Sequence, residues 1–264
     1  MPKLLQRQKP APKWYPFALI GLIVLVHLLD TYATDVVTKV QSLYVNEFFV
    51  RGQGLSFETG LQRATLISTM GYAFALIGPF YKALMDKIGR RPIFIINTAG
   101  MALGMLLCWY APNFYLFAAG QLMIVFFTMH DMQMIYVYEA SPAKWRSTLY
   151  FACKFLGVFG TLAIPLLRDA FVQANGTGWR NLFWLPALVG GAIFLLALLF
   201  MRESDVFIQS RLEPKKPEEK DKKSGIVPAL KYIFSHRQLK WLSGVPNLVK
   251  PQRERNIYNN ALHI

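Results

Sequence analysis

Long apolar blocks dominate this sequence of 264 residues and limit the folds open to it. Six blocks of about 20 to 25 residues can be distinguished: 15–37, 61–81, 92–111, 114–138, 147–167 and 181–201. A helix of about 20 apolar residues is long enough to cross the hydrocarbon core of a bilayer, which is about 30 Å thick. A soluble chain of this length would instead disperse its apolar residues by period. The pattern predicts an all-α polytopic membrane protein with six transmembrane helices.

Basic residues are distributed unevenly among the segments that connect these blocks. Of the 29 Lys and Arg, 4 precede residue 14, 4 lie in 82–91, 2 lie in 139–146 and 13 lie from Arg202 onward, whereas the opposite loops share five. Because cytoplasmic loops of membrane proteins are enriched in Lys and Arg, we expect both termini in the cytoplasm. The net charge of +14 follows this topology, which argues against nucleic acid as a partner. We expect a multi-pass protein of the lipid bilayer, in a bacterial plasma membrane.

The chain divides by composition into four parts. We expect a cytoplasmic N-terminal segment (1–14), a six-helix transmembrane bundle (15–201), a charged cytoplasmic linker (202–225), and an interfacial basic helix with an unpatterned tail (226–264). The last part reads as the truncated start of a second half. Within the bundle, the loop 38–60 contains Gly breakers and is predicted to be irregular.

Charged groups recur at one predicted membrane depth. They lie in the turn "MDKIGRRP" (85–92), in the next basic loop and after the sixth block, and include Asp86, Arg90, Arg91, Glu139, Arg146, Arg202 and Glu203. We expect Glu139 to pair with Arg90 or Arg91. Glu203 is expected to pair with Arg146. An exposed pair contributes only about 0.2–1 kcal/mol, but a network of pairs can be made and broken as helices move.

Polar residues form a stripe along the first block. His27, Asp30, Thr31, Thr34, Asp35 and Thr38 fall within a wedge of about 140° when successive residues are placed 100° apart around a helix. Ionisable groups inside a membrane usually face a cavity or a partner, so we interpret the stripe as a cavity wall that binds a substrate or protons. Hydrogen bonding between helices is the alternative interpretation.

The fourth and fifth blocks also contain polar residues: His130, Asp131 and Gln133 in the fourth, and Lys154 in the fifth. Asp131 and Lys154 each lie seven residues from the expected cytoplasmic helix end, and therefore about 10 Å deep. We predict that these two side chains pair or share a polar cavity. Lys154 has two alternative roles, either binding an anionic group of a substrate or extending toward the cytoplasm.

Two glycines indicate a helix contact, and motifs typical of enzymes are absent from the sequence. Gly100 and Gly104 form a GxxxG pattern, which predicts close helix packing. The sequence has no phosphate-binding Gly-rich loop, no zinc-ligand spacing and no Ser-His-Asp order. We therefore expect no enzyme activity, no cofactor and no metal site.

The charged groups resemble a known family. Asp86-Lys87-Ile88-Gly89-Arg90-Arg91 resembles the signature between spans two and three of the major facilitator superfamily. Glu139, Pro142 and Arg146 resemble its echo between spans four and five, and Arg202-Glu203-Ser204 is similar to the end of span six in sugar-porter-like members. The resemblance covers residues 15 to about 242, which correspond to the N-terminal half and central loop of a twelve-span transporter. The chain departs from the pattern at Lys82, where the family has Gly.

The resemblance implies a secondary active transporter of small solutes, of sugar or organic acid type, with Asp30 or Asp131 carrying a coupling proton as in a symporter. The implied substrate and proton cavity comprises His27, Asp30, Thr31, Thr34, Asp35, His130, Asp131, Gln133 and Lys154. The implied cytoplasmic gate network comprises Asp86, Gly89, Arg90, Arg91, Glu139, Arg146, Arg202 and Glu203. A transport-inactive truncated protein, or a half-transporter that needs a partner or a homodimer, remains the alternative.

Overall fold

The computed structural model describes residues 12–212 apart from 13, 74–80, 82, 83, 86, 129–131, 142 and 143. All of these residues belong to one compact unit, Met1–Pro214, and a second unit, Lys215–Ile264, lies outside them. The interfacial helix and tail expected over 226–264 therefore lie outside the described residues, as does almost all of the N-terminal segment.

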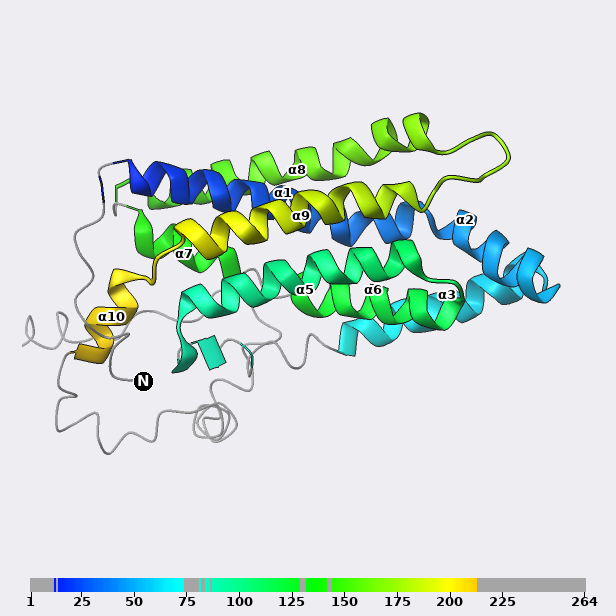
Figure 1. The fold of residues 1–264 in the computed structure, drawn as a ribbon, viewed down its shortest axis with the longest axis horizontal. Coiled ribbons are helices and arrows are strands. Elements are labelled where there is room, and N and C mark those ends of the chain that lie inside the picture. Colours follow the sequence, from blue (N-terminus) through cyan, green and yellow to red (C-terminus); the bar gives the residue numbers. More distant parts are fainter. Residues whose placement is uncertain are drawn as a thin grey trace, which may run out of the picture. The chain divides into compact units, whose positions relative to one another are not determined.

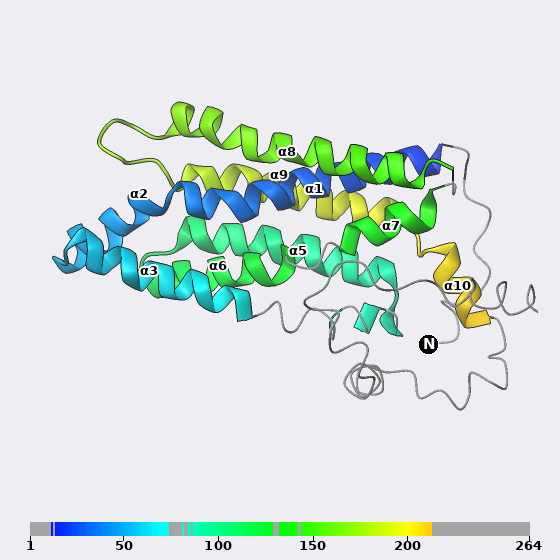
Figure 2. The same ribbon diagram turned by 180° about the vertical axis from the view of Figure 1, so that it is seen from behind.

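The described residues are all-helical and contain no strand, which confirms the all-α part of the predicted fold class. The helices are α1 (Tyr15–Lys39), α2 (Gln41–Val45), the π-helix η2 (Asn46–Arg51), α3 (Phe57–Tyr72), α5 (Arg90–Tyr110), α6 (Phe114–Thr128), α7 (Met132–Ala140), α8 (Arg146–Phe171), α9 (Asn181–Phe200) and α10 (Asp205–Leu212). Figures 1 and 2 show them from opposite sides.

Within the described part of the chain, four helices, α1, α5, α8 and α9, are long and apolar enough to cross a membrane. They coincide with four of the predicted apolar blocks. The other two blocks are represented by α3 and by the shorter apolar helix α6 followed by α7, and residues 74–80 and 129–131 of those blocks lie outside the described part of the chain.

Helix α1 packs against both α8 and α9, and α5 packs against α6 and α9 (Figures 1 and 2). Glycines permit the closest approaches. A Cβ atom added to Gly104 of α5 would lie 3.1 Å from the backbone nitrogen of Ile124 in α6, and one added to Gly100 would overlap the Phe127 ring. The GxxxG pattern thus lies in a helix contact, as its spacing predicts.

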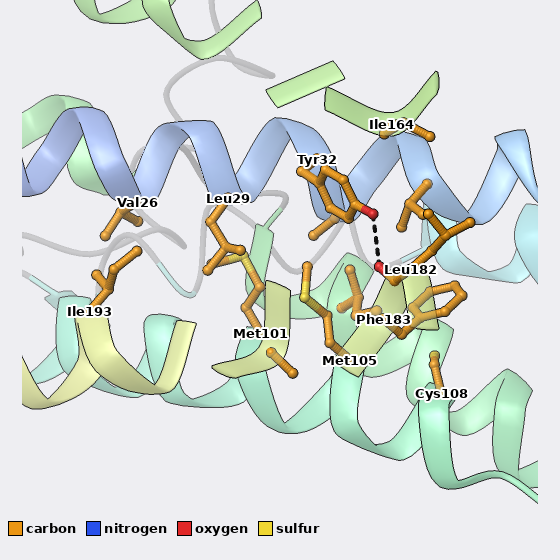
Figure 3. Close-up of a cluster of buried hydrophobic side chains, with 14 of the residues drawn as sticks. Val26, Leu29, Tyr32, Met101, Met105, Cys108, Ile164, Leu182, Phe183 and Ile193 are labelled. Carbon is orange, nitrogen blue, oxygen red and sulfur yellow. Dashed lines mark hydrogen bonds between the residues drawn. The ribbon is translucent and has the colours of Figure 1, made fainter. Parts of the chain in front are cut away.

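The apolar core lies between α1, α5 and α9 (Figure 3). Val26 and Leu29 of α1 face Ile193 of α9 and Met101 of α5 in this cluster. One hydrogen bond is buried in this cluster, in which the Tyr32 hydroxyl donates to the backbone oxygen of Leu182 at 2.8 Å. A buried hydroxyl needs such a partner, so this bond fixes how far α1 lies along α9.

The loop predicted to be irregular is largely helical, and this prediction was wrong. Residues 41–51 form α2 and η2, and the helical turn ends before Gly54, whose φ of +67° is accessible to Gly at little cost. Tyr44, Phe48 and Phe49 are buried and recur at helical spacing. Their burial against other aromatic rings stabilises a helix that the Gly breakers disfavour locally.

The expected linker 202–225 also contains a helix. Asp205–Leu212 forms α10, in which Phe207 and Ile208 are buried, and the remainder from residue 213 lies outside the described residues. The apolar pair explains the helix, because it gives a charged segment one face that packs on the bundle.

Candidate functional site

A polar cavity of about 500 Å³ lies between α1, α3, α6 and α8. All six residues of the α1 stripe line it: His27, Asp30, Thr31, Thr34, Asp35 and Thr38. Ser68 of α3, Gln121 and Thr128 of α6, and Lys154 of α8 complete its polar lining. The predicted stripe is therefore gathered into one cavity wall in an otherwise apolar bundle.

A histidine and a carboxylate lie deepest in this wall. His27 is 3 % exposed and Asp30 is 8 % exposed. The Nδ1 atom of His27 lies 3.6 Å from Oδ2 of Asp30, one helical turn further along α1. A buried carboxylate is costly unless it has a polar partner, and the His27 ring is a polar group beside Asp30 in the cavity wall.

Hydroxyl groups tie this wall to α8. The Thr31 hydroxyl lies 2.6 Å from the backbone oxygens of both His27 and Gly157, and Thr161 donates to Oδ2 of Asp35. Thr34 donates within α1 to the oxygen of Asp30 at 2.9 Å. Two stripe residues, Thr31 and Asp35, therefore take part in interhelical hydrogen bonds as well as lining the cavity. That the wall binds a substrate or protons stays a prediction.

The α1–α8 contact is close because α8 presents glycines. A Cβ atom added to Gly160 would overlap the backbone oxygen of Leu28 and lie 2.9 Å from Oγ1 of Thr31. One added to Gly157 would overlap the His27 ring. The cavity wall thus depends on two α8 positions that tolerate no side chain.

Three polar lining residues, Ser68, Gln121 and Thr128, are absent from the predicted site. Gln121 is 3 % exposed, and its buried side chain interacts with the Tyr44 hydroxyl, although Nε2 has no partner in ideal hydrogen-bond geometry. Such an atom carries a desolvation cost unless water or a ligand bonds to it. A glutamine inside an apolar block could have been recognised in the sequence as a candidate cavity residue, whereas a single Ser or Thr is common in membrane spans.

Several predicted cavity residues lie beyond what the structure describes. His130 and Asp131 are outside the described residues, and so is the predicted contact between Asp131 and Lys154. The backbone of Gln133 belongs to α7, but its side chain is not described. Lys154 lines the cavity on the α8 side.

One end of the bundle carries several charged residues. We call it the charged end and define it by Arg90, Arg91, Glu139, Arg202 and Glu203. Nε of Arg90 lies 3.1 Å from Oε1 of Glu139, and both side chains are mostly buried, so the expected pair is present. The Arg90 guanidinium also lies 5.0 Å from the centre of the Phe207 ring in α10. Together, the contacts of Arg90 with Glu139 and with Phe207 join α5 to α7 and α10.

Glu203 has a different partner from the one predicted. Its carboxylate accepts hydrogen bonds from the backbone nitrogens of Arg90 at 2.8 Å and Arg91 at 3.2 Å, the first residues of α5. Gly89 precedes them with a φ of +119°, a conformation that favours glycine. A carboxylate at a helix N-terminus satisfies free N–H groups and the helix dipole, which outcompetes a surface pair with Arg146. Arg146 instead donates to the backbone oxygen of Ser141 at 3.5 Å.

Arg202 lies at the junction of α9 and α1. Its backbone nitrogen donates to the Tyr15 hydroxyl at 2.9 Å, and its guanidinium lies 5.8 Å from the centre of the Tyr15 ring. Asp86, the remaining member of the predicted gate network, lies outside the described residues.

Buried polar atoms without a protein partner also concentrate near the charged end. They are Nε of Arg91, the Tyr136 hydroxyl, Oε2 of Glu139, Oγ of Ser141 and Nε of Arg146. Because unsatisfied buried groups are costly, this region is expected to bind water or to rearrange its contacts. Tyr136 was not singled out from the sequence, since an aromatic residue in an apolar block gives no signal of its own.

The other end of the bundle is an aromatic cluster closed by an ion pair. Its rings are Tyr44, Phe48, Phe49, Phe114, Phe117, Trp179 and Phe183. Glu47 accepts from Nε1 of Trp179 and from Arg180, each at 2.6 Å. Burial raises the pKa of the Tyr44 hydroxyl, which therefore remains protonated. This cluster joins the α2–η2 segment to the start of α9.

An all-helical bundle with long apolar helices and a buried polar cavity defines the chain as a polytopic membrane protein. The chain belongs to the Major Facilitator Superfamily, whose family model matches residues 17–249. Members of this family are transporters and not enzymes. Among the described residues, no group of three or more His, Cys, Asp or Glu could hold a metal ion.

Individual relatives agree with the family. The chain is 30 % identical over 189 residues to the tetracycline resistance protein, class H, of Pasteurella multocida, covering 70 % of this chain and 44 % of that protein. It is 32 % identical over 123 residues to the glucose transporter GlcP of Staphylococcus epidermidis, covering 46 % of this chain and 27 % of that protein. The chain therefore spans less than half the length of these relatives.

A solved structure shares the fold. The xylose transporter XylE from E. coli, in a partially occluded inward-open conformation, is 19 % identical with a TM-score of 0.65. The match covers 75 % of this chain and 52 % of that one. This likeness shows that the fold is shared, and the chain matches about half of the solved transporter.

Proposed function

We propose that the chain forms one solute-binding half of a secondary active transporter, which moves a small polar solute of sugar or organic acid type across a cell membrane. The observation that carries this proposal is the polar cavity between α1, α3, α6 and α8. Buried polar surface is costly inside a membrane protein, and it is retained where a solute or an ion must be bound.

The chemistry of the cavity suits a solute with several hydroxyl or carboxyl groups. Thr34, Thr38 and Ser68 offer hydroxyl groups, and the amide of Gln121 offers a donor. Lys154 would meet a carboxylate on the solute, if the solute is an organic acid. Asp30 is the proposed proton carrier, because a proton bound there would change the charge of the cavity beside His27.

The proposed topology has six spans with both ends in the cytoplasm of a bacterial cell. The charged end would then be cytoplasmic, where its pairs form and break as the helices move. A second six-helix half, from a longer chain, a partner or a second copy, would supply the opposing cavity wall. The coverage of about half of XylE supports this division of the site.

The alternative is a half that binds its solute without transporting it. Alternating access in this kind of transporter relies on two halves moving against each other, so the alternative holds if the chain binds a solute but gives no uptake even when a second half is joined to it.

Solute binding and uptake separate these two functions. The purified chain would be screened for thermal stabilisation by sugars and organic acids, and then assayed for uptake in liposomes with a pH gradient, alone and joined to a second half. We expect the proton gradient to drive uptake by the joined protein, and Asp30→Asn to remove the pH dependence. Asp169→Asn, an exposed carboxylate at the end of α8, is the matched control.

Three results of these assays would contradict one of the proposals. An Asp30→Asn variant with the rate and pH dependence of the control would refute the proton role. Binding without uptake, even when the second half is present, would favour the transport-inactive alternative. No stabilisation by any solute of these classes would contradict the binding proposal itself.

A further inference from the structure

A second hollow lies on the outer surface of the bundle, between the beginning of α1 and the end of α9. Its volume is about 370 Å³, and its walls include Trp14, Tyr15, Leu22 and Leu25 from the α1 side and Phe200 from α9. The two helices run side by side at this place (Figure 1). Unlike the polar cavity, this groove has almost entirely apolar walls, so it suits a hydrocarbon ligand.

The length of the groove matches one leaflet of a bilayer. From Trp14 to Leu25 it follows α1 for about 17 Å at 1.5 Å per residue, and half of a 30 Å hydrocarbon core is about 15 Å. Gly21 keeps its middle open, because a Cβ atom added there would meet nothing within 4 Å. An acyl chain that enters at the end of the helices would therefore remain in contact with the groove for most of its length.

The mouth of the groove carries a positive charge. Tyr15 is a wall residue, and its ring lies 5.8 Å from the guanidinium carbon of Arg202. The hydrogen bond from the Arg202 nitrogen to the Tyr15 hydroxyl, 2.9 Å long, holds the ring and the cation together. Trp14, at the same mouth, is 57 % exposed, as is usual for an indole at the membrane–water interface.

We propose that this groove binds an anionic phospholipid, with one acyl chain between α1 and α9 and the phosphate group at Arg202. The complementarity is of two kinds, because the walls match a hydrocarbon chain and the guanidinium matches a phosphate, which it binds through paired N–H groups. The site is distinct from the polar cavity. It depends on the chain lying in a membrane and not on the proposed transport.

Binding is tested on the full chain, purified in neutral detergent. Native mass spectrometry and thermal unfolding would compare phosphatidylglycerol with phosphatidylcholine of the same acyl chains, and with inorganic phosphate. We expect phosphatidylglycerol to bind more tightly and to stabilise more than phosphatidylcholine. Inorganic phosphate is expected to give no shift, because it lacks the acyl chain.

Two variants address the two parts of the site. Gly21→Leu fills the groove, and we expect it to bind both phospholipids more weakly than Gly191→Leu does. Gly191 is the matched control, since it too has nothing within 4 Å of an added Cβ atom but is not part of the groove. Arg202→Gln is expected to weaken phosphatidylglycerol binding by about fivefold and phosphatidylcholine binding by less, because phosphatidylcholine has the same phosphate but no net charge. Lys144→Gln, which removes an exposed positive charge elsewhere, is its control.

Three results would overturn the proposal. They are equal phospholipid binding by Gly21→Leu and Gly191→Leu, an unchanged preference for phosphatidylglycerol in Arg202→Gln, and equal stabilisation by inorganic phosphate. The arginine substitution leaves the groove walls intact, so the proposal remains falsifiable even if Gly21→Leu does not fold.

Discussion

Replacing Gly160 of α8 by alanine is expected to separate the two helices that form the cavity wall. The added Cβ atom would overlap the backbone oxygen of Leu28 in α1. Because the obstacle is backbone, no side-chain rotation relieves the overlap, and α1 and α8 have to move apart. The hydrogen bond from Thr31 to the oxygen of Gly157, 2.6 Å long, would be stretched by the same movement.

The magnitude follows from three contributions. Inserting a group into a closely packed contact costs about 1–3 kcal/mol, and the stretched interhelical hydrogen bond adds about 0.6 kcal/mol in a membrane protein. Alanine improves intrinsic helix stability over glycine by about 1 kcal/mol, which opposes both. We therefore expect Gly160→Ala to lower the free energy of unfolding by about 0.5–2.5 kcal/mol.

Unfolding of the purified chain in mixed micelles, followed by the helical circular dichroism signal, measures this change. Gly191→Ala is the control, because its Cβ atom would meet nothing within 4 Å and the substitution should be neutral or slightly stabilising. A Gly160→Ala protein as stable as the Gly191→Ala protein would refute the close approach of α1 and α8.

Two carboxylates are expected to stabilise the ends of the bundle, and Asp169→Ala serves as an exposed control for both in the same unfolding measurement. Glu203→Ala removes the acceptor for the first N–H groups of α5 and should cost about 0.5–2 kcal/mol; a loss no greater than that of the control would show that this cap is not needed. Glu47→Ala deprives the Trp179 indole of its charged acceptor and should cost about 1–2 kcal/mol, the lower part of the usual range because Glu47 is partly exposed. An unchanged stability of Glu47→Ala would contradict a structural role for this pair.

Periodicity predicted the parts of the fold that depend on one helix at a time. The apolar blocks located α1, α5, α8 and α9 to within a few residues, since span length and hydropathy are properties of local sequence. The stripe on α1 was also predictable, because residues such as Asp30 and Thr34 share a face at 100° per residue. The residues around Tyr44 were not, because their helical state depends on burial against distant rings rather than on local propensity.

The hydrogen-bond and ion-pair partners of a residue were harder to predict than the helix in which the residue lies. Glu203 was matched to an arginine by charge alone, whereas the structure gives it the backbone N–H groups of α5, which carry no signal in the sequence. Gln121 was a recognisable polar residue in an apolar block, but its place in the cavity lining opposite α1 depends on how α6 packs, which the sequence of α6 alone does not show. Contacts between helices depend on how the helices rotate and tilt, and that information lies outside any one segment.

The polar face of α1 lines the cavity, and we expect water to reach it there. Thiol labelling tests it directly in a background in which both buried cysteines, Cys108 and Cys153, are replaced by alanine. Thr34→Cys would face the cavity. Leu106→Cys, on α5 and four residues from its end, is also exposed but is expected to face lipid.

A charged, membrane-impermeant methanethiosulfonate reagent needs water to reach a thiol and to form the reactive thiolate. If water reaches the polar face of α1, Thr34→Cys in lipid nanodiscs is labelled, and Leu106→Cys shows little or no labelling under the same conditions. Absence of labelling at Thr34→Cys, or equal labelling of the two variants, would contradict this expectation.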